Sequence, residues 1–161
     1  MSRVSHTFTP VWDERSRILI LGSFPSVRSR EQGFYYGHPQ NRFWKVLAAV
    51  TGGSVPQTIE EKRAFLLEQR IAIWDVIDSC EIQGSSDSSI RNVVPSDIAG
   101  LLRDSGILRV YVNGGKAAEL YEKYTLPVTG IPAVKLPSTS PANAAWSLER
   151  LIAAWRVIRQ E

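Results

Sequence analysis

Residues 18–21 form an uninterrupted apolar run, Ile-Leu-Ile-Leu, which ends at Gly22. An apolar run of this length fits a strand with both faces buried, as in a parallel sheet that helices cover. Short segments of strand character recur three more times along the chain. They lie at residues 71–77, 109–113 and 133–136. The sequence therefore predicts a buried sheet of four strands.

Segments with helical features separate the predicted strands. Thr58 and Glu61 have the spacing of a capping box, and Asn41 and Ser96 are candidates to cap two other helices. We expect helices at residues 42–50, from residue 58 onward, and at residues 96–102, 116–124 and 143–159. Strands that alternate with helices predict an α/β fold, here a three-layer α/β/α sandwich with a central four-stranded parallel sheet. Residues 1–161 are expected to form a single domain.

The residue counts exclude several kinds of site. Cys80 is the only cysteine and the chain has two histidines, so a disulfide, a thiolate zinc cluster and a histidine-rich metal site are not expected. The net charge of +3 permits nucleic-acid binding without requiring it. The sequence has no apolar signal-peptide core and no run of about 18 apolar residues. We expect a cytoplasmic, monomeric protein that makes no contact with a membrane.

Four strand ends are expected to meet at one edge of the sheet, where ligands bind in open parallel sheets. The segments at that edge are residues 22–26, Asp75, residues 113–115 and residues 137–141. Two long loops, at residues 22–40 and 79–96, are predicted beside them. No segment forms a nucleophile elbow, a dinucleotide-binding glycine motif or a phosphate loop with its lysine. The aromatic rings, amides and backbone N–H groups gathered there can instead hold a flat heterocycle.

Two motifs carry a resemblance to a known family. Residues 34–45 read Phe-Tyr-Tyr-Gly-His-Pro-Gln-Asn-Arg-Phe-Trp-Lys, and residues 136–141 read Leu-Pro-Ser-Thr-Ser-Pro. The first resembles a segment of mismatch-specific uracil/thymine DNA glycosylases, and the second resembles a loop of that group that enters DNA. Together with the Gly-Ser-Phe-Pro turn after the first strand, they are most similar to the hypoxanthine-DNA glycosylase branch of the uracil-DNA glycosylase superfamily, across essentially the whole chain.

The resemblance implies a monofunctional DNA glycosylase of base excision repair. Such an enzyme flips a deaminated base, here most of all hypoxanthine, out of DNA and hydrolyses its N-glycosidic bond. The implied partner is DNA that contains deaminated bases, and neither a metal nor another cofactor is required.

The resemblance also implies roles for individual residues. Uracil enzymes position the attacking water with an Asp or Asn in the first motif, whereas Phe24 occupies that place here. In the hypoxanthine branch an Asn that matches Asn41 takes over this catalytic role. Tyr36 is expected to stack on the extruded base, and Gly37 to leave room for it. The other implied base contacts are Ser23, Phe24 and Asn113, and the implied DNA contacts are Ser26, Ser138, Thr139 and Ser140.

Several alternatives stay open at the level of sequence. Asn41 has a structural interpretation as a helix cap, and Asp75 is a rival for holding the water. Uracil is an alternative main substrate. A DNA-binding module without catalysis and an unrelated flavodoxin-like protein that binds a small ligand are alternatives of other classes.

Overall fold

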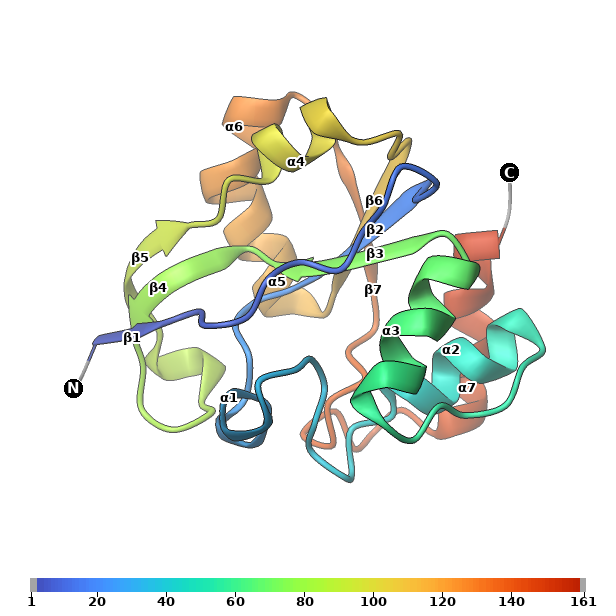
Figure 1. Ribbon diagram of the computed structural model, residues 1–161. Coiled ribbons are helices and arrows are strands. Elements are labelled where there is room, and N and C mark those ends of the chain that lie inside the picture. Colours follow the sequence, from blue (N-terminus) through green and yellow to red (C-terminus); the bar gives the residue numbers. More distant parts are fainter. Residues whose placement is uncertain (1–2, 160–161) are drawn as a thin grey trace.

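The computed structural model describes residues 3–159 and contains the predicted parallel sheet (Figure 1). Its strand order is β3-β2-β6-β7, formed by Ile71–Asp75, Ile18–Gly22, Arg109–Asn113 and Ala133–Leu136. Each neighbouring pair of these strands is parallel. The carboxyl ends of all four strands therefore lie along one edge of the sheet, as the sequence predicts.

The sheet separates two apolar cores. Side chains alternate along β2, so that Ile18 and Ile20 enter one core while Leu19 and Leu21 enter the other. The first core lies under α2 (Phe43–Thr51), α3 (Ile59–Glu68) and α7 (Leu148–Trp155). The second lies under α4 (Ile98–Asp104), α5 (Gly115–Leu120) and α6 (Leu126–Thr129). Figure 1 shows these two groups of helices on opposite sides of the sheet, which confirms the three-layer α/β/α prediction.

A second, antiparallel sheet lies beside the first, and the sequence patterns do not predict it. Its strand order is β1-β4-β5, formed by Arg3–Ser5, Ile77–Glu81 and Arg91–Pro95. The prediction of one long loop over residues 79–96 is wrong, because much of this segment forms the β4–β5 hairpin. Serine and charged residues give these strands weak strand propensity, so pairing with their neighbours decides their structure.

The helix starts test the capping predictions. The Thr58–Glu61 capping box is present, because each residue's side chain accepts the backbone N–H of the other. Asp97 caps α4 in place of Ser96, and its Oδ1 accepts the N–H of Gly100 at 2.9 Å. A carboxylate makes the stronger hydrogen bond at a helix start, which explains why the cap lies one residue later than expected.

Other boundaries also differ from the predicted ones. Helix α7 begins at Leu148 and not at residue 143, and a π-helical turn at Tyr121–Thr125 separates α5 from α6. The loop over residues 22–40 contains a short helix, α1 (Val27–Gln32). No helix within residues 3–159 is both long and apolar enough to cross a membrane.

Candidate active site

A cavity of about 390 Å³ lies at the carboxyl edge of the parallel sheet. The exits of all four strands line it, as expected for an open parallel sheet. The segment before α2 and the tip of the β4–β5 hairpin complete its walls. Every residue predicted for the site lines this cavity except Gly37. The structure thus brings together motifs that lie about a hundred residues apart in the chain.

Thr139 joins two amides in the floor of the cavity. Its hydroxyl donates to Oδ1 of Asn41 at 2.9 Å and accepts from Nδ2 of Asn113 at 3.0 Å. Its backbone N–H donates to Oδ1 of Asn113 at 3.1 Å. Thr139 is completely buried. Its hydroxyl is therefore occupied within the protein, and the residue orients Asn41 and Asn113 from behind.

Asn41 also caps α2. Its Oδ1 accepts the N–H of Phe43, the first residue of that helix, at 2.9 Å. Arg42 stands at the cap position itself and makes no cap bond with its side chain. With Oδ1 accepting two hydrogen bonds, Nδ2 is the polar atom of Asn41 that has no hydrogen bond to a described residue. Nδ2 is therefore the group of the Asn41 side chain that remains free to contact a ligand in the cavity.

Tyr36 presents an aromatic surface to the cavity. Its ring lies flat on the ring of Phe43, with centroids 3.8 Å apart and planes inclined by 14°. Its hydroxyl is buried without a hydrogen-bond partner among residues 3–159. Burial and the nearby Asp75 carboxylate raise the pKa of Tyr36 far above the ordinary value. Because Phe43 covers one face of the ring, the other face is the one available to a flat ligand.

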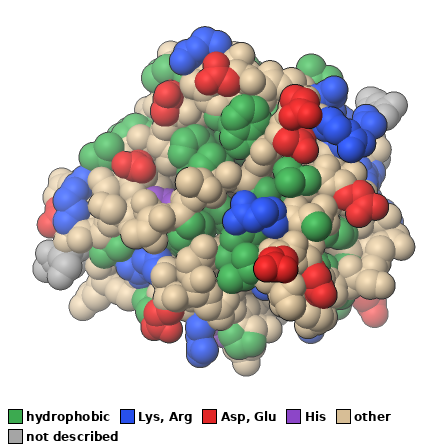
Figure 2. All heavy atoms as spheres, viewed as in Figure 1, with side chains coloured by type: hydrophobic (Ala, Val, Ile, Leu, Met, Phe, Trp, Pro, Cys, Tyr) green, Lys and Arg blue, Asp and Glu red, His purple; other side chains and the backbone are tan. Residues whose placement is uncertain are grey.

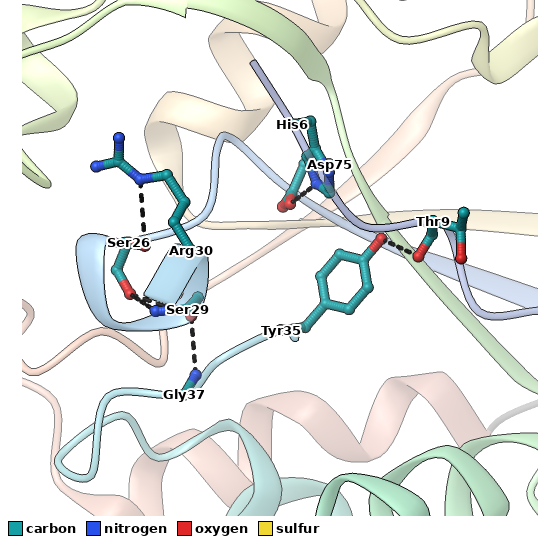
Figure 3. A network of polar contacts seen from close by, with 8 residues as sticks. All are labelled: His6, Thr9, Ser26, Ser29, Arg30, Tyr35, Gly37 and Asp75. Carbon is teal, nitrogen blue, oxygen red and sulfur yellow. Dashed lines mark hydrogen bonds and ion pairs between the residues drawn. The ribbon is translucent and has the colours of Figure 1, made fainter. Parts of the chain in front are cut away.

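The turn after β2 supplies donors to the cavity. The backbone N–H groups of Ser23 and Phe24 donate to none of the described residues, and both residues line the cavity. The hydroxyl of Ser23 donates to Asp87 at 3.1 Å and so links the turn to the hairpin tip. Ser26 caps α1, because its hydroxyl accepts the N–H of Ser29 at 3.2 Å (Figure 3). The backbone amides of Ser23 and Phe24 are therefore free donors of this turn.

Gly37 packs against α1. Its N–H donates to the Ser29 hydroxyl at 2.9 Å, as Figure 3 shows. A Cβ atom on Gly37 would lie 3.4 Å from the Cα atom of Ser29 in α1 and would also displace the Gln32 side chain. The missing side chain thus makes room for α1, and Gly37 does not line the cavity.

Arg42 holds the loop that follows β7. Its guanidinium donates to the carbonyls of Ser140 at 2.9 Å and Asn143 at 3.1 Å, and also to the carbonyl of Trp146. The hydroxyls of Ser138 and Ser140 line the cavity and accept only local backbone N–H groups. One arginine therefore fixes the loop that carries the predicted DNA-contacting serines.

His6 and Asp75 form a buried pair that the sequence patterns do not reveal. Nε2 of His6 lies 2.8 Å from Oδ2 of Asp75, and the two side chains are 2% and 5% exposed. Figure 3 shows His6, from the segment after β1, reaching Asp75 at the end of β3. Asp75 lines the cavity. The two residues are separated by 69 positions, and no sequence pattern joins them.

Comparison with known proteins identifies the class to which this geometry belongs. Residues 9–159 match the family model of the uracil DNA glycosylase superfamily. The chain therefore belongs to the uracil DNA glycosylase superfamily.

Individual relatives are similar over nearly their whole length. A protein of Methanosarcina acetivorans named hypoxanthine DNA glycosylase is 36% identical over 148 residues, which are 91% of this chain and 93% of the relative. A protein of the same name from Methanosarcina barkeri is 33% identical, with 84% and 86% covered. A solution NMR structure of a candidate uracil DNA glycosylase from M. acetivorans has a TM-score of 0.78 and 35% identity, and covers 95% of this chain and 97% of that chain.

Proposed function

We propose that this protein is a monofunctional DNA glycosylase that removes deaminated bases, hypoxanthine above all, in base excision repair. The observation that carries the proposal is the cavity at the sheet edge, where a free aromatic face, free backbone donors and oriented amides converge. Membership of the superfamily and two relatives named hypoxanthine DNA glycosylase support the same activity. Uracil is the second candidate base, which the name of the NMR neighbour favours.

The reaction follows from the placement of these groups. An extruded base stacks on the free face of Tyr36, and Asn113 contacts its edge. As the N-glycosidic bond breaks, negative charge develops on the base, where the N–H groups of Ser23 and Phe24 stabilise it. Asn41 positions the water that adds to C1′ of the deoxyribose. No lysine among the described residues lines the cavity, so the proposed product is an abasic site in an uncut strand.

The DNA strand is proposed to follow the rim of the cavity. Hydroxyls of Ser26, Ser138 and Ser140 are placed there to meet phosphates. A shallower hollow shares Ser138 and Ser140 with the cavity and adds Lys135. Figure 2 shows cationic and anionic side chains interspersed on the face that it draws, without an extended patch of one sign. The proposed phosphate contacts at the rim are therefore the serine hydroxyls together with Lys135.

One assay tests the proposal. Oligonucleotides that contain hypoxanthine, uracil, xanthine or a thymine mismatch are incubated with the protein and then treated with hot alkali, which cuts at abasic sites. We expect cleavage at hypoxanthine above all others and none before alkali. Preference for uracil would move the assignment to the second candidate, and DNA binding without cleavage of any base would show a binding module. Size-exclusion chromatography tests the monomeric state expected from the sequence, for which elution as a single chain is the expected result.

A further inference from the structure

The His6–Asp75 pair has an asymmetric environment. Oδ2 of Asp75 is engaged by Nε2 of His6 at 2.8 Å, whereas Oδ1 receives no hydrogen bond from residues 3–159. Oδ1 of Asp75 packs against Gly22, since a Cβ atom added to Gly22 would lie only 2.5 Å from Oδ1. The same Cβ position would lie 3.0 Å from the Tyr36 hydroxyl oxygen. One carboxylate oxygen is thus fixed, and the other is free beside the ring expected to hold the base.

The surroundings of His6 determine which of its ring nitrogens carries a proton. Rings of Phe8, Phe24 and Tyr35 surround the imidazole, with centroids 4.4, 6.1 and 5.8 Å away. Nδ1 is buried and has no hydrogen-bond partner among the described residues. A proton on Nδ1 would have no acceptor there, whereas a proton on Nε2 is donated to Asp75. His6 therefore acts as a fixed donor to Oδ2.

We propose that Asp75 reads the base by accepting its ring N–H through Oδ1, with His6 as the residue that positions the carboxylate. Hypoxanthine carries this hydrogen on N1 and uracil carries it on N3, whereas the same atoms of adenine and cytosine are acceptors. A carboxylate repels those acceptors and leaves its own oxygen unpaired. The pair thus favours hypoxanthine over adenine and uracil over cytosine, the normal bases from which these two lesions arise.

The inference deepens the proposed function and rests on it, because it requires that the base occupies this cavity. Sites built to bond a substrate N–H can reject analogues without that hydrogen by about 10⁴-fold or more. A carboxylate suits this task because it only accepts, whereas an amide can turn to present a donor. Asp75 thereby receives a role distinct from holding the water, which the proposed mechanism gives to Asn41.

The test compares two substrates in single-turnover cleavage, hypoxanthine and N1-methylhypoxanthine, the second of which lacks the ring N–H. Asp75→Ala is expected to slow hypoxanthine removal about 100-fold and to leave removal of the methylated base near the parent's rate. Equal slowing on both substrates would mean that Asp75 serves the water, and an unchanged rate on hypoxanthine would mean that it serves neither; both overturn the inference. Asp78→Ala, which changes an exposed carboxylate of β4, is the control and keeps the parent's rates.

Two further variants keep the test decisive if Asp75→Ala does not fold. In Asp75→Asn, His6 draws the amide oxygen and turns the amide N–H group toward the base, so the ratio of hypoxanthine to adenine cleavage falls about 100-fold. His6→Ala lowers hypoxanthine removal about tenfold and brings the two substrates' rates together, and His6→Gln, which keeps a donor, restores part of the difference. A His6→Ala protein that melts earlier but keeps the parent's ratio between the two substrates would show that His6 is only structural.

The parent protein separates the two levels of the proposal. A parent that cleaves hypoxanthine while the variants keep its selectivity overturns the base-reading pair alone. A parent that cleaves none of the four lesions overturns the proposed function, and the inference falls with it.

Discussion

The Thr139 hydroxyl donates a hydrogen bond of 2.9 Å to the amide oxygen of Asn41. The two residues belong to motifs separated by 98 positions, and Thr139 is completely buried between Asn41 and Asn113. The hydrogen bond links the segment before α2 to the loop after β7. The residue proposed to hold the water is therefore oriented by the loop proposed to contact DNA.

Asn41→Ala should remove the water-positioning amide and one helix-cap bond together. We expect cleavage of the preferred base to fall about 100-fold or more, and the free energy of unfolding to fall by about 1 kcal/mol. Single-turnover cleavage and urea unfolding measure the two effects. Thr139→Val is the companion variant, because it keeps the Asn41 amide and removes the hydrogen bond that orients it, together with the bond from Asn113. If Thr139→Val lowers the cleavage rate as much as Asn41→Ala does, the orientation supplied by Thr139, and not the Asn41 amide alone, sets the rate.

Tyr36 should act through its ring and not through its hydroxyl. Tyr36→Phe keeps the stacking on Phe43 and removes a hydroxyl that is buried without a partner among the described residues, so its cleavage rate should stay close to the parent's. Tyr36→Ala removes the ring and should weaken binding of the extruded base by about 1–3 kcal/mol. Titration of DNA under single-turnover conditions checks both variants. A strongly impaired Tyr36→Phe protein would move the role to the hydroxyl.

Arg42→Lys should loosen the loop after β7. An ammonium group cannot reproduce the planar set of donors that now meets three carbonyls, so we expect a loss of about 1–3 kcal/mol in unfolding free energy. Affinity for DNA should fall with it, since the loop carries Ser138 and Ser140. Urea unfolding and fluorescence anisotropy with labelled DNA measure the two quantities. Arg28→Lys, at an exposed position, is the control for stability.

Tyr35 should make the fold sensitive to alkali. Its hydroxyl donates to the Thr9 carbonyl at 2.8 Å, and burial, followed by the Asp75 carboxylate, raises its pKa far above the ordinary value near 10. Above about pH 10 the unfolded chain loses this proton while the folded chain keeps it, so the unfolded state binds fewer protons. The unfolding free energy should then fall with rising pH, with about 1.4 kcal/mol per pH unit due to this group.

Tyr35→Phe isolates that contribution. The variant cannot ionise at this position, so its unfolding free energy between about pH 10 and 12 should fall less steeply than the parent's. Chemical unfolding at a series of pH values gives both slopes. Parallel slopes for the two proteins would contradict the raised pKa of Tyr35.

The parallel sheet and most of the cavity follow from local patterns. The apolar run of β2, the Thr58 capping box and the glycines at the strand exits each act within a few residues, and such features are visible in a sequence. The partners of Asn41 were less visible, because capping of α2 and the bond to Thr139 use the same oxygen atom. His6 lies in a polar leader segment, and its contact with Asp75 depends on the pairing of Val4 with Cys80 between β1 and β4. Such nonlocal pairing in weakly strand-forming segments leaves no periodicity to detect.

The small antiparallel sheet has a consequence for how this fold can diversify. If His6 and Asp75 select the base, selectivity depends on how the antiparallel sheet β1-β4-β5 is placed against the end of β3, because His6 follows β1 and Asp75 ends β3. Only Val76 separates β3 from β4. The proposed attacking water instead depends on Asn41, which Thr139 orients from the exit of β7 at the other end of the parallel sheet. Base preference and glycosidic bond cleavage would then be separable properties, so that changes confined to His6 and Asp75 would alter the preferred base while Asn41 and Thr139 stay in place.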